Sequence, residues 1–355
     1  MRQIRSTAVG AAVYYLGRFT SNHRAKPAQE CPMSSDAKFL LLDAKDVGQL
    51  IEPAKVFDAM KRAFTLHSQR EGRVFPVVRE QLHTGGVFGI KSGDVPNADL
   101  LGFKAAGFWP SNRKAGKEPH QATILLIDPH TGRPLCLIDG NTITTVRTGA
   151  VGALGLTLLA RPESTSLCIF GTGTQARIQL SFALRYMPMI KRVSYVTVNG
   201  QPDDGFEKEL GHLCTLIHAQ DADAAVSGSD IVVTATPGVG PLFSPAAIRA
   251  GTHLNCVGAD TKGKRELPEG VLGRSRLFTD DRDQSRSIGE GQWDAECPSI
   301  EIGDLLTGKV RLKRDLEDIT VFDMTGLALQ DLVVAEMLWH LATAKSQGTT
   351  LSWPW

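Results

Sequence analysis

Ser166-Leu-Cys-Ile-Phe170 leads directly into Gly171-Thr-Gly173-Thr-Gln-Ala176, and an apolar-periodic run then continues through Leu184. This order predicts a buried strand, a glycine turn and a helix. The first glycine permits a tight turn, the second lets the backbone approach a pyrophosphate, and Ala176 allows the helix to pack closely on the strand. The positive end of the helix would then face the phosphates. The segment therefore predicts a dinucleotide site, although an ordinary strand-to-helix turn has the same local pattern.

A strand and helix alternation follows this glycine turn. We expect strands over residues 193–199, 231–236, 254–258, 275–279 and 319–323, and helices over 222–225 and 245–250. Strands that alternate with helices form a parallel sheet covered on both faces. We therefore predict an α/β fold, with a doubly wound Rossmann domain over residues 148–324.

The first half of the chain has a different pattern. An amphipathic helix is expected over 52–69, followed by short β-like runs at 74–78, 87–90, 102–106, 122–127 and 134–138, and by a helix over 142–160. Turn residues separate the runs, and Asp128-Pro-His-Thr-Gly132 predicts a hairpin. We expect a mostly antiparallel sheet in a separate α+β domain over residues 36–147. The apolar segment 325–350 is expected to form a helix that completes this domain.

Composition narrows the choice of partner and compartment. The 355 residues include 39 basic and 38 acidic side chains, so the net charge is +1 and no bulk field recruits nucleic acid or an anionic membrane. A small molecule is the expected partner. The six cysteines form no C-x-x-C pair, which favours a reduced, cytoplasmic protein without a metal site.

Residues 1–35 differ from the rest of the chain. They are basic, with no acid before Glu30, and their apolar stretch from Ala8 to Leu16 is too short to span a bilayer. The composition suits a transit peptide, and the basic-then-apolar order suits a signal peptide. A start near Met33 is a third reading. We leave this leader out of the fold prediction.

Several motifs in a fixed order give the chain a family resemblance. They are Phe103-Lys104, Pro119-His120-Gln121, Val146-Arg147-Thr148, the run from Gly258 to Leu267, and the run from Phe322 to Asp331. With these motifs the chain resembles the ornithine cyclodeaminase/mu-crystallin family from about Phe39 to the late helix. The resemblance implies a substrate-binding and dimerisation domain, a Rossmann domain, a returning C-terminal helix and a homodimer.

Within this family the chain is most similar to the iminosuccinate reductases. The similarity lies in Phe75–Glu80, Trp109–Asn112, Asp260–Lys264 and Phe278–Asp281. It implies an NAD(P)H-dependent reductase that converts iminosuccinate to L-aspartate, and that acts as an amino-acid dehydrogenase in reverse.

The resemblance also implies which side chains carry the chemistry. Arg79, Lys104 and Arg147 match the positions that hold the substrate carboxylate, a task that suits the planar fork of arginine. Asp260 matches the proton-handling acid, so Asp260 and Lys104 are the expected catalytic residues. From the residues alone, each cation could belong to an ordinary ion pair and Asp260 could cap a turn.

Lys91 marks a departure from the family pattern. Cyclodeaminases have a carboxylate near the position of Gly89 to receive a distal amine, and this chain has none there. Lys91, with Ser92, would instead attract a second carboxylate and repel an ammonium group. A solvated lysine in a loop is the alternative. His120 and Gln121 are expected in a loop beside the substrate, or else as structural hydrogen-bonding groups.

The nucleotide is expected to be NAD, held by three stretches of the Rossmann domain and by two single residues, Thr148 and Asn199. Asn199 stands where an acid would indicate NAD and an arginine NADP, and without an adjacent arginine we favour NADH over NADPH. The expected set is Thr148, Gly171, Thr172, Gly173, Thr174, Gln175, Ala176, Asn199, Thr234, Ala235, Thr236, Val257 and Gly258.

Other functions share these features. A pyrroline- or piperideine-2-carboxylate reductase needs the same carboxylate clamp without a second cation, and an alanine dehydrogenase-like enzyme is a related possibility. An ornithine cyclodeaminase would need the missing distal acid. A non-catalytic, mu-crystallin-like binding protein is the remaining alternative, and the combination of Lys104, Arg147 and Asp260 argues against it.

Overall fold

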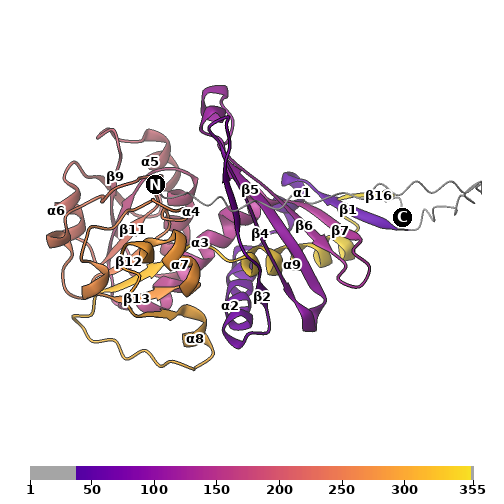
Figure 1. Cartoon of the computed structure of the whole chain (residues 1–355). Coiled ribbons are helices and arrows are strands. Elements are labelled where there is room, and N and C mark those ends of the chain that lie inside the picture. The colour runs from indigo at the N-terminus through magenta and orange to yellow at the C-terminus, as the bar shows by residue number, and fades with distance from the viewer. Residues whose placement is uncertain (1–36, 353–355) are drawn as a thin grey trace, which may run out of the picture.

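The computed structural model describes residues 37–352 and arranges them around two sheets that lie apart in Figure 1. The leader at residues 1–35 lies outside the described residues. We name the two parts of the chain after the roles that the sequence predicts for them. The substrate half contains the sheet of β1 to β7 with β16, called the first sheet, and the nucleotide half contains the sheet of β8 to β15, called the second sheet (Figure 1). Two sheets that each pack against helices agree with the α/β fold class that the sequence predicts.

The substrate half is built mainly from the first part of the chain. Its elements are β1 (Lys38–Leu42), α1 (Ala44–Leu50), α2 (Pro53–Gln69), β2 (Arg73–Val74), β3 (Val78–Gln81), β4 (Val87–Val95), β5 (Leu100–Phe108), β6 (His120–Ile127), β7 (Pro134–Asp139), α9 (Ala328–Lys345) and β16 (Thr349–Ser352), with short 3₁₀ turns at Pro96–Ala98 and Pro110–Ala115. Neighbouring strands run in the order β16-β1-β7-β6-β5-β4-β2, and β3 also pairs with β4. Only the β1–β7 pairing among these described strands is parallel.

Two details of this half differ from the sequence prediction. The run expected as one strand over 74–78 is divided into β2 and β3, because Pro76 lacks the N–H that a continuous ladder needs. The strand β16, which pairs antiparallel with β1, was not predicted. The late helix α9 packs on the first sheet, where Ala328 lies next to Gly93 and Leu332 next to Gly102.

The nucleotide half is a parallel sheet of eight strands. Its elements are β8 (Ser166–Phe170), α4 (Thr174–Tyr186), β9 (Arg192–Val196), α5 (Asp204–Leu210), β10 (Thr215–His218), α6 (Ala222–Ser227), β11 (Ile231–Thr234), β12 (His253–Cys256), β13 (Arg276–Thr279), α7 (Arg282–Ile288), β14 (Ser299–Glu301), α8 (Ile302–Leu306) and β15 (Thr320–Asp323), with 3₁₀ turns at Pro245–Ala247, Leu272–Arg274 and Glu290–Trp293. The order is β10-β9-β8-β11-β12-β15-β13-β14, so β9 and β10 lie on one side of β8 while β11 and the later strands lie on the other. The helix expected over 245–250 is only a short 3₁₀ turn.

The helix α3 (Gly140–Leu159) joins the halves, and the boundary expected between residues 147 and 148 falls inside it. Its small residues allow close contacts on both sides: Gly140 packs on Ala122 of the first sheet, and Gly149 packs on Ile178 of α4. Among the described helices, α3 alone is long and apolar enough to cross a membrane, but most of it is buried between the halves. It is therefore a shared core helix (Figure 1).

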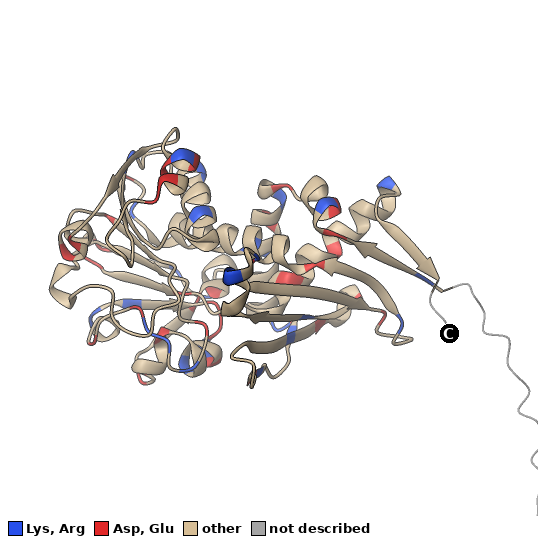
Figure 2. Ribbon diagram, turned by 90° about the horizontal axis from the view of Figure 1, so that it is seen from above, with Lys and Arg blue, Asp and Glu red and all other residues tan. Residues whose placement is uncertain are grey.

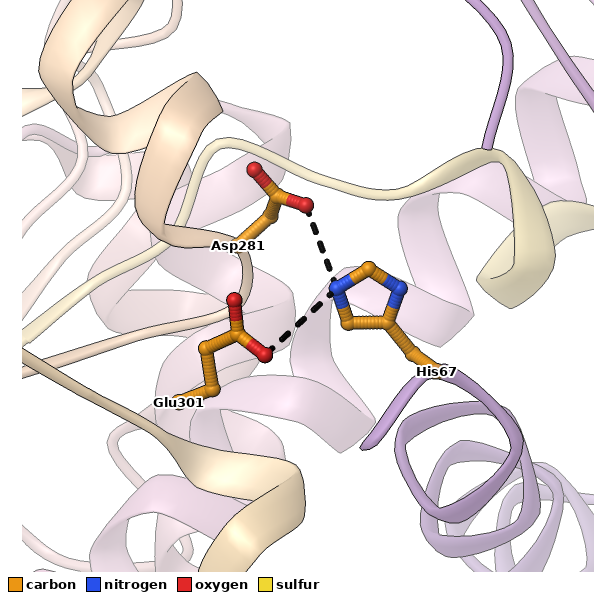
Figure 3. A group of neighbouring side chains, drawn as sticks. All are labelled: His67, Asp281 and Glu301. Atoms are coloured by element: carbon orange, nitrogen blue, oxygen red, sulfur yellow. Dashed lines mark ion pairs between the residues drawn. The ribbon is translucent and has the colours of Figure 1, made fainter. Parts of the chain in front are cut away.

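A buried ion cluster also holds the halves together (Figure 3). His67 near the end of α2 directs Nε2 at Oδ2 of Asp281, 3.1 Å away, and at Oε2 of Glu301, 3.8 Å away. The other oxygen of Asp281 accepts a hydrogen bond from the Gln284 amide and caps α7. Because His67 and the two carboxylates come from different halves, the cluster fixes their relative position.

Candidate active site

One large cavity opens at the carboxyl ends of the parallel strands, between the two halves. Its volume is about 1640 Å³, which is large enough for a dinucleotide together with a small acid. The glycine turn and the loops after β9, β11 and β12 form its nucleotide side, and α3 and the segment before α9 form the other side. Figure 2 shows acidic and basic residues mixed over both halves and also present where the halves meet.

The glycine turn has the geometry that its sequence predicts. Gly171 has a φ of +96°, and a Cβ there would lie 2.8 Å from the Ala235 carbonyl oxygen. A Cβ on Gly173 would meet no protein atom within 4 Å, so the open space lies on the cavity side. No side chain caps the N-terminus of α4, and its first amides are free to bind an anion. These residues fit the pyrophosphate of a dinucleotide.

Most of the predicted nucleotide residues line this cavity. The lining members are Thr148, Gly171, Thr172, Gly173, Thr174, Gln175, Asn199, Ala235, Thr236, Val257 and Gly258. Two predicted members lie behind the wall: Ala176 is fully buried in the packing of α4, and the Thr234 hydroxyl donates to Glu266. They support the wall without facing the cavity.

Lys104 and Arg147 share one buried partner that the sequence reasoning did not single out. Asp331, in the first turn of α9, lies 2.7 Å from Nζ of Lys104 and 3.2 Å from Nε of Arg147. Gln330 accepts a further hydrogen bond from Arg147. Burial opposes the charged form of Asp331, yet Lys104 and Arg147 hold the pKa of this carboxyl below its usual range. A carboxylate in the first turn of a mostly apolar helix was the signal for such a partner.

The two strand lysines lie side by side, because Lys91 of β4 is directly opposite Lys104 of β5 in the register. Nζ of Lys91 donates to the carbonyl oxygens of Thr325 and Gly326, each at 2.7 Å. Burial lowers the pKa of Lys104 to about 7 and that of Lys91 to about 8, with neighbouring cations adding to the effect. Lys91 is thus a buried strand residue behind Thr325 and Gly326, which line the cavity, and neither Lys91 nor Lys104 is itself a lining residue. The alternative of a solvated loop lysine is wrong.

Asp260 lies on the cavity wall near the start of the loop after β12. It accepts a hydrogen bond from Lys264 at 2.7 Å, and Arg79 of β3 approaches it at 3.4 Å. Although burial opposes ionisation, Lys264 and then Arg79 hold the pKa of Asp260 well below its usual range. Asp260 is therefore a firmly ionised acceptor. Lys264 also lines the cavity, and its place in the quoted motif was the only sequence signal for it.

His120 lines the cavity, while two other predicted contacts point elsewhere. His120 and Gln121 begin strand β6 and do not lie in a loop, so their side chains alternate between the sheet faces. His120 faces the site, and burial followed by Lys104 and Arg147 lowers its pKa to about 4. Gln121 instead donates to the Glu118 carbonyl oxygen. Ser92 follows Lys91 in β4 and so points to the opposite face of the sheet.

The fold and the cavity define a dinucleotide-dependent oxidoreductase with a cationic pocket beside a carboxylate. The sequence pattern of the ornithine cyclodeaminase/mu-crystallin family matches residues 38–346. The chain belongs to this family.

Individual relatives are similar over nearly their full lengths. The iminosuccinate reductase of Paracoccus denitrificans is 33% identical over 315 residues, which cover 86% of this chain and 97% of that protein. The structure of that reductase in complex with NAD+ superposes with a TM-score of 0.81 at 32% identity and covers 89% of this chain and 99% of its own. An archaeal alanine dehydrogenase dimer with bound NAD gives a TM-score of 0.83 at 28% identity, with coverage of 89% and 99%. The Thermococcus litoralis Delta(1)-pyrroline-2-carboxylate reductase, in complex with NADH and L-proline, gives 0.81 at 27% identity, with coverage of 87% and 99%.

Proposed function

We propose that this chain is an NADH-dependent reductase of iminosuccinate and forms L-aspartate. The observation that carries the proposal is an excess of positive charge at the site. Among the described residues, five cations and three carboxylates interact there: Arg79, Lys91, Lys104, Arg147 and Lys264 with Asp260, Asp280 and Asp331. Two positive charges are left over when Lys91 and Lys104 are both protonated, which suits a substrate with two carboxylates.

Each group has a role that its contacts support. Arg147 lines the cavity and binds the α-carboxylate, and Lys104 just behind it adds positive charge while sharing the buried Asp331 with it. Lys91 attracts the distal carboxylate from β4, and Lys264 adds a second cation on the wall. Asp260, held ionised, accepts hydrogen bonds from the imine nitrogen and stabilises its protonated form. Bound NADH supplies the hydride to the imine carbon.

The pKa of Asp260 changes the role expected from the sequence. A carboxyl whose pKa lies below its usual range has no proton to donate near neutral pH. The substrate nitrogen therefore enters already protonated, and Asp260 orients it and balances its charge. After reduction, the amine takes its further proton from solvent at the open cavity.

NADH is favoured over NADPH by charge at the far end of the cavity. Asp203 and Asp204 line the cavity near Asn199, and they would repel the additional phosphate of NADPH. The neighbouring Arg177 is occupied by Asp203 and Glu209 and by the Thr172 carbonyl oxygen. The relatives crystallised with NAD, NAD+ or NADH support the same choice.

A homodimer formed through the first sheet is also proposed. The core-facing positions Ile124 and Leu126 are buried, whereas Phe103, Leu125 and Leu137 on the other face of the sheet are only half-buried. An apolar sheet face of this kind is typical of an interface between identical subunits. The structural neighbour described as an alanine dehydrogenase dimer supports this assembly.

Reduction of a cyclic imine carboxylate is the second candidate. Its single carboxylate would use Arg147 and Lys104, and the similarity to the Thermococcus litoralis enzyme favours it. It leaves Lys91 and Lys264 without a substrate group, so it accounts for less of the positive charge.

An NADH-oxidation screen tests the proposal. Oxaloacetate, pyruvate and glyoxylate are each supplied with ammonium, and pyrroline-2-carboxylate is supplied alone. We expect oxaloacetate with ammonium to give the highest kcat/KM. Faster turnover of pyrroline-2-carboxylate would favour the second candidate, and no oxidation with any substrate would favour a binding protein.

A further inference from the structure

Glu266 lies in the motif that contains Asp260, but none of the roles above involves it. Its side chain is completely buried behind the cavity wall. Oε1 accepts hydrogen bonds from the Thr236 amide and hydroxyl, both at 2.8 Å. Oε2 accepts from the Thr234 hydroxyl at 2.7 Å and the Gly258 amide at 2.8 Å. One carboxylate therefore joins the loop after β11 to the loop after β12.

The two loops meet tightly at this carboxylate. A Cβ on Gly258 would lie 2.2 Å from the Thr236 carbonyl oxygen and 2.5 Å from Oε1 of Glu266, so only glycine fits. The backbone of Glu266 is fixed as well, since its carbonyl accepts from the Leu242 amide and its amide donates to Glu290. Thr236 and Gly258 both line the cavity, and Gly258 lies two residues before Asp260.

We propose that Glu266 is a positioning residue that sets the nicotinamide-side wall and the placement of Asp260 by tying the two loops together. This inference rests on the proposed dinucleotide-dependent reduction. Glu266 touches neither substrate nor nucleotide and acts through Thr236 and Gly258. A misplacement of the wall by about 1 Å is enough to slow catalysis about 100-fold.

The hydrogen-bond pattern makes Glu266→Gln a sharp test. Each carboxylate oxygen accepts from one backbone amide, of Thr236 or of Gly258. Whichever way a glutamine is turned, its NH2 group meets an amide N–H that cannot reverse its direction. The variant keeps the size of the side chain and loses one of the two loop connections.

Glu290→Gln is the matched control. Glu290 is a buried neighbour that accepts from the Glu266 and Leu267 amides through Oε1 alone. Burial, with Asp323 adding to it, raises the pKa of Glu290 to about 8. A neutral glutamine can present its carbonyl oxygen to the same two amides, so the wall stays in place.

The experiment compares the two variants by amide hydrogen exchange, NADH binding and turnover. For Glu266→Gln we expect faster exchange in segments 234–238 and 256–260 only, kcat about 100-fold lower with a smaller change in KM, and a raised deuterium isotope effect with NADH deuterated at C4. Glu290→Gln should match the wild-type protein in its exchange rates, its NADH binding, its kinetic constants and its isotope effect. Thr234→Val, which removes one donor outside the cavity, should give a smaller loss of the same kind and replaces Glu266→Gln if that variant does not fold.

Three outcomes would overturn the inference. They are unchanged kcat and exchange in Glu266→Gln, faster exchange throughout the chain, or equal losses in Glu290→Gln. Failure of the proposed reaction itself is recognised separately, because the wild-type protein would then oxidise no NADH while the exchange comparison could still be made.

Discussion

The two sides of the cavity are built in contrasting ways. In the proposed function, recognition on the nucleotide side depends on backbone: Gly171 adopts a positive φ, and the uncapped start of α4 offers its amides. On the substrate side it depends on charged side chains from distant segments, such as Lys91 on β4 and Asp331 on α9. A binding site formed by backbone should tolerate few changes in the shape of the chain. At a site formed by charged side chains, the affinity should change when one charge is removed or when the pH is changed.

The largest expected effect is on Asp260, the carboxylate of the substrate side. Asp260→Asn removes the charge that stabilises a protonated imine, and we expect kcat to fall about 1000-fold. NADH affinity should not change, because Asp260 belongs to the substrate side of this comparison. Steady-state kinetics and NADH fluorescence titration measure the two quantities. The exposed Asp283→Asn is the control, and a loss below about tenfold would remove Asp260 from the chemistry.

Arg147→Gln tests the charged clamp next. Loss of a charged donor to the α-carboxylate should lower kcat/KM about 100-fold, mainly through KM. Asp331 keeps Lys104 at 2.7 Å, so the variant should remain folded. The exposed Arg185→Gln serves as the comparison. An unchanged KM would contradict a clamp at Arg147.

The glycine pair tests the backbone side. Gly171→Ala brings a Cβ to 2.8 Å from the Ala235 carbonyl oxygen at a φ of +96°, so we expect lower thermal stability together with much weaker NADH binding. Gly173→Ala meets no protein atom within 4 Å, so its stability should be unchanged while NADH affinity falls about tenfold. Thermal melting and fluorescence titration separate the two effects. Full NADH affinity in Gly173→Ala would exclude a pyrophosphate at this turn.

A smaller effect is expected from pH. Lys104 and Lys91, with pKa values of about 7 and about 8, bind an anion best when protonated. Affinity for a dicarboxylate should thus be highest below pH 7 and fall about tenfold as pH rises through both values. Inhibition by succinate, which has no group titrating in this range, measures it. The affinity for NADH should stay flat, and a parallel fall would show that the two sides do not differ.

The same contrast explains which features could be predicted from the sequence. The glycine turn, Asn199 and the alternating strands are contiguous in the chain, and local pattern predicted them. The substrate side depends on pairing that no local pattern contains: strand parity turns Ser92 and Gln121 away from the cavity, and the partners of Lys91 are carbonyl groups more than 230 residues later in the chain. The final strand β16 likewise depends on pairing with the distant strand β1, whereas the break between β2 and β3 has a local cause in Pro76.

Two further contacts could not be derived from spacing. Glu266 supports both loops of the nucleotide side from behind, and His67 joins the halves through Asp281 and Glu301. Both depend on elements that meet only in the folded chain. The family resemblance pointed to Lys104, Arg147 and Asp260, of which Arg147 and Asp260 line the cavity and Lys104 lies behind it, while their partners became visible only in three dimensions.

A crystal structure of the protein with NAD+ and L-aspartate tests the central claim most directly. The account predicts the α-carboxylate on Arg147 and Lys104, the amine beside Asp260, and the β-carboxylate toward Lys91 and Lys264. An aspartate whose β-carboxylate faces solvent, away from both lysines, would contradict the claim that the surplus charge selects a dicarboxylate.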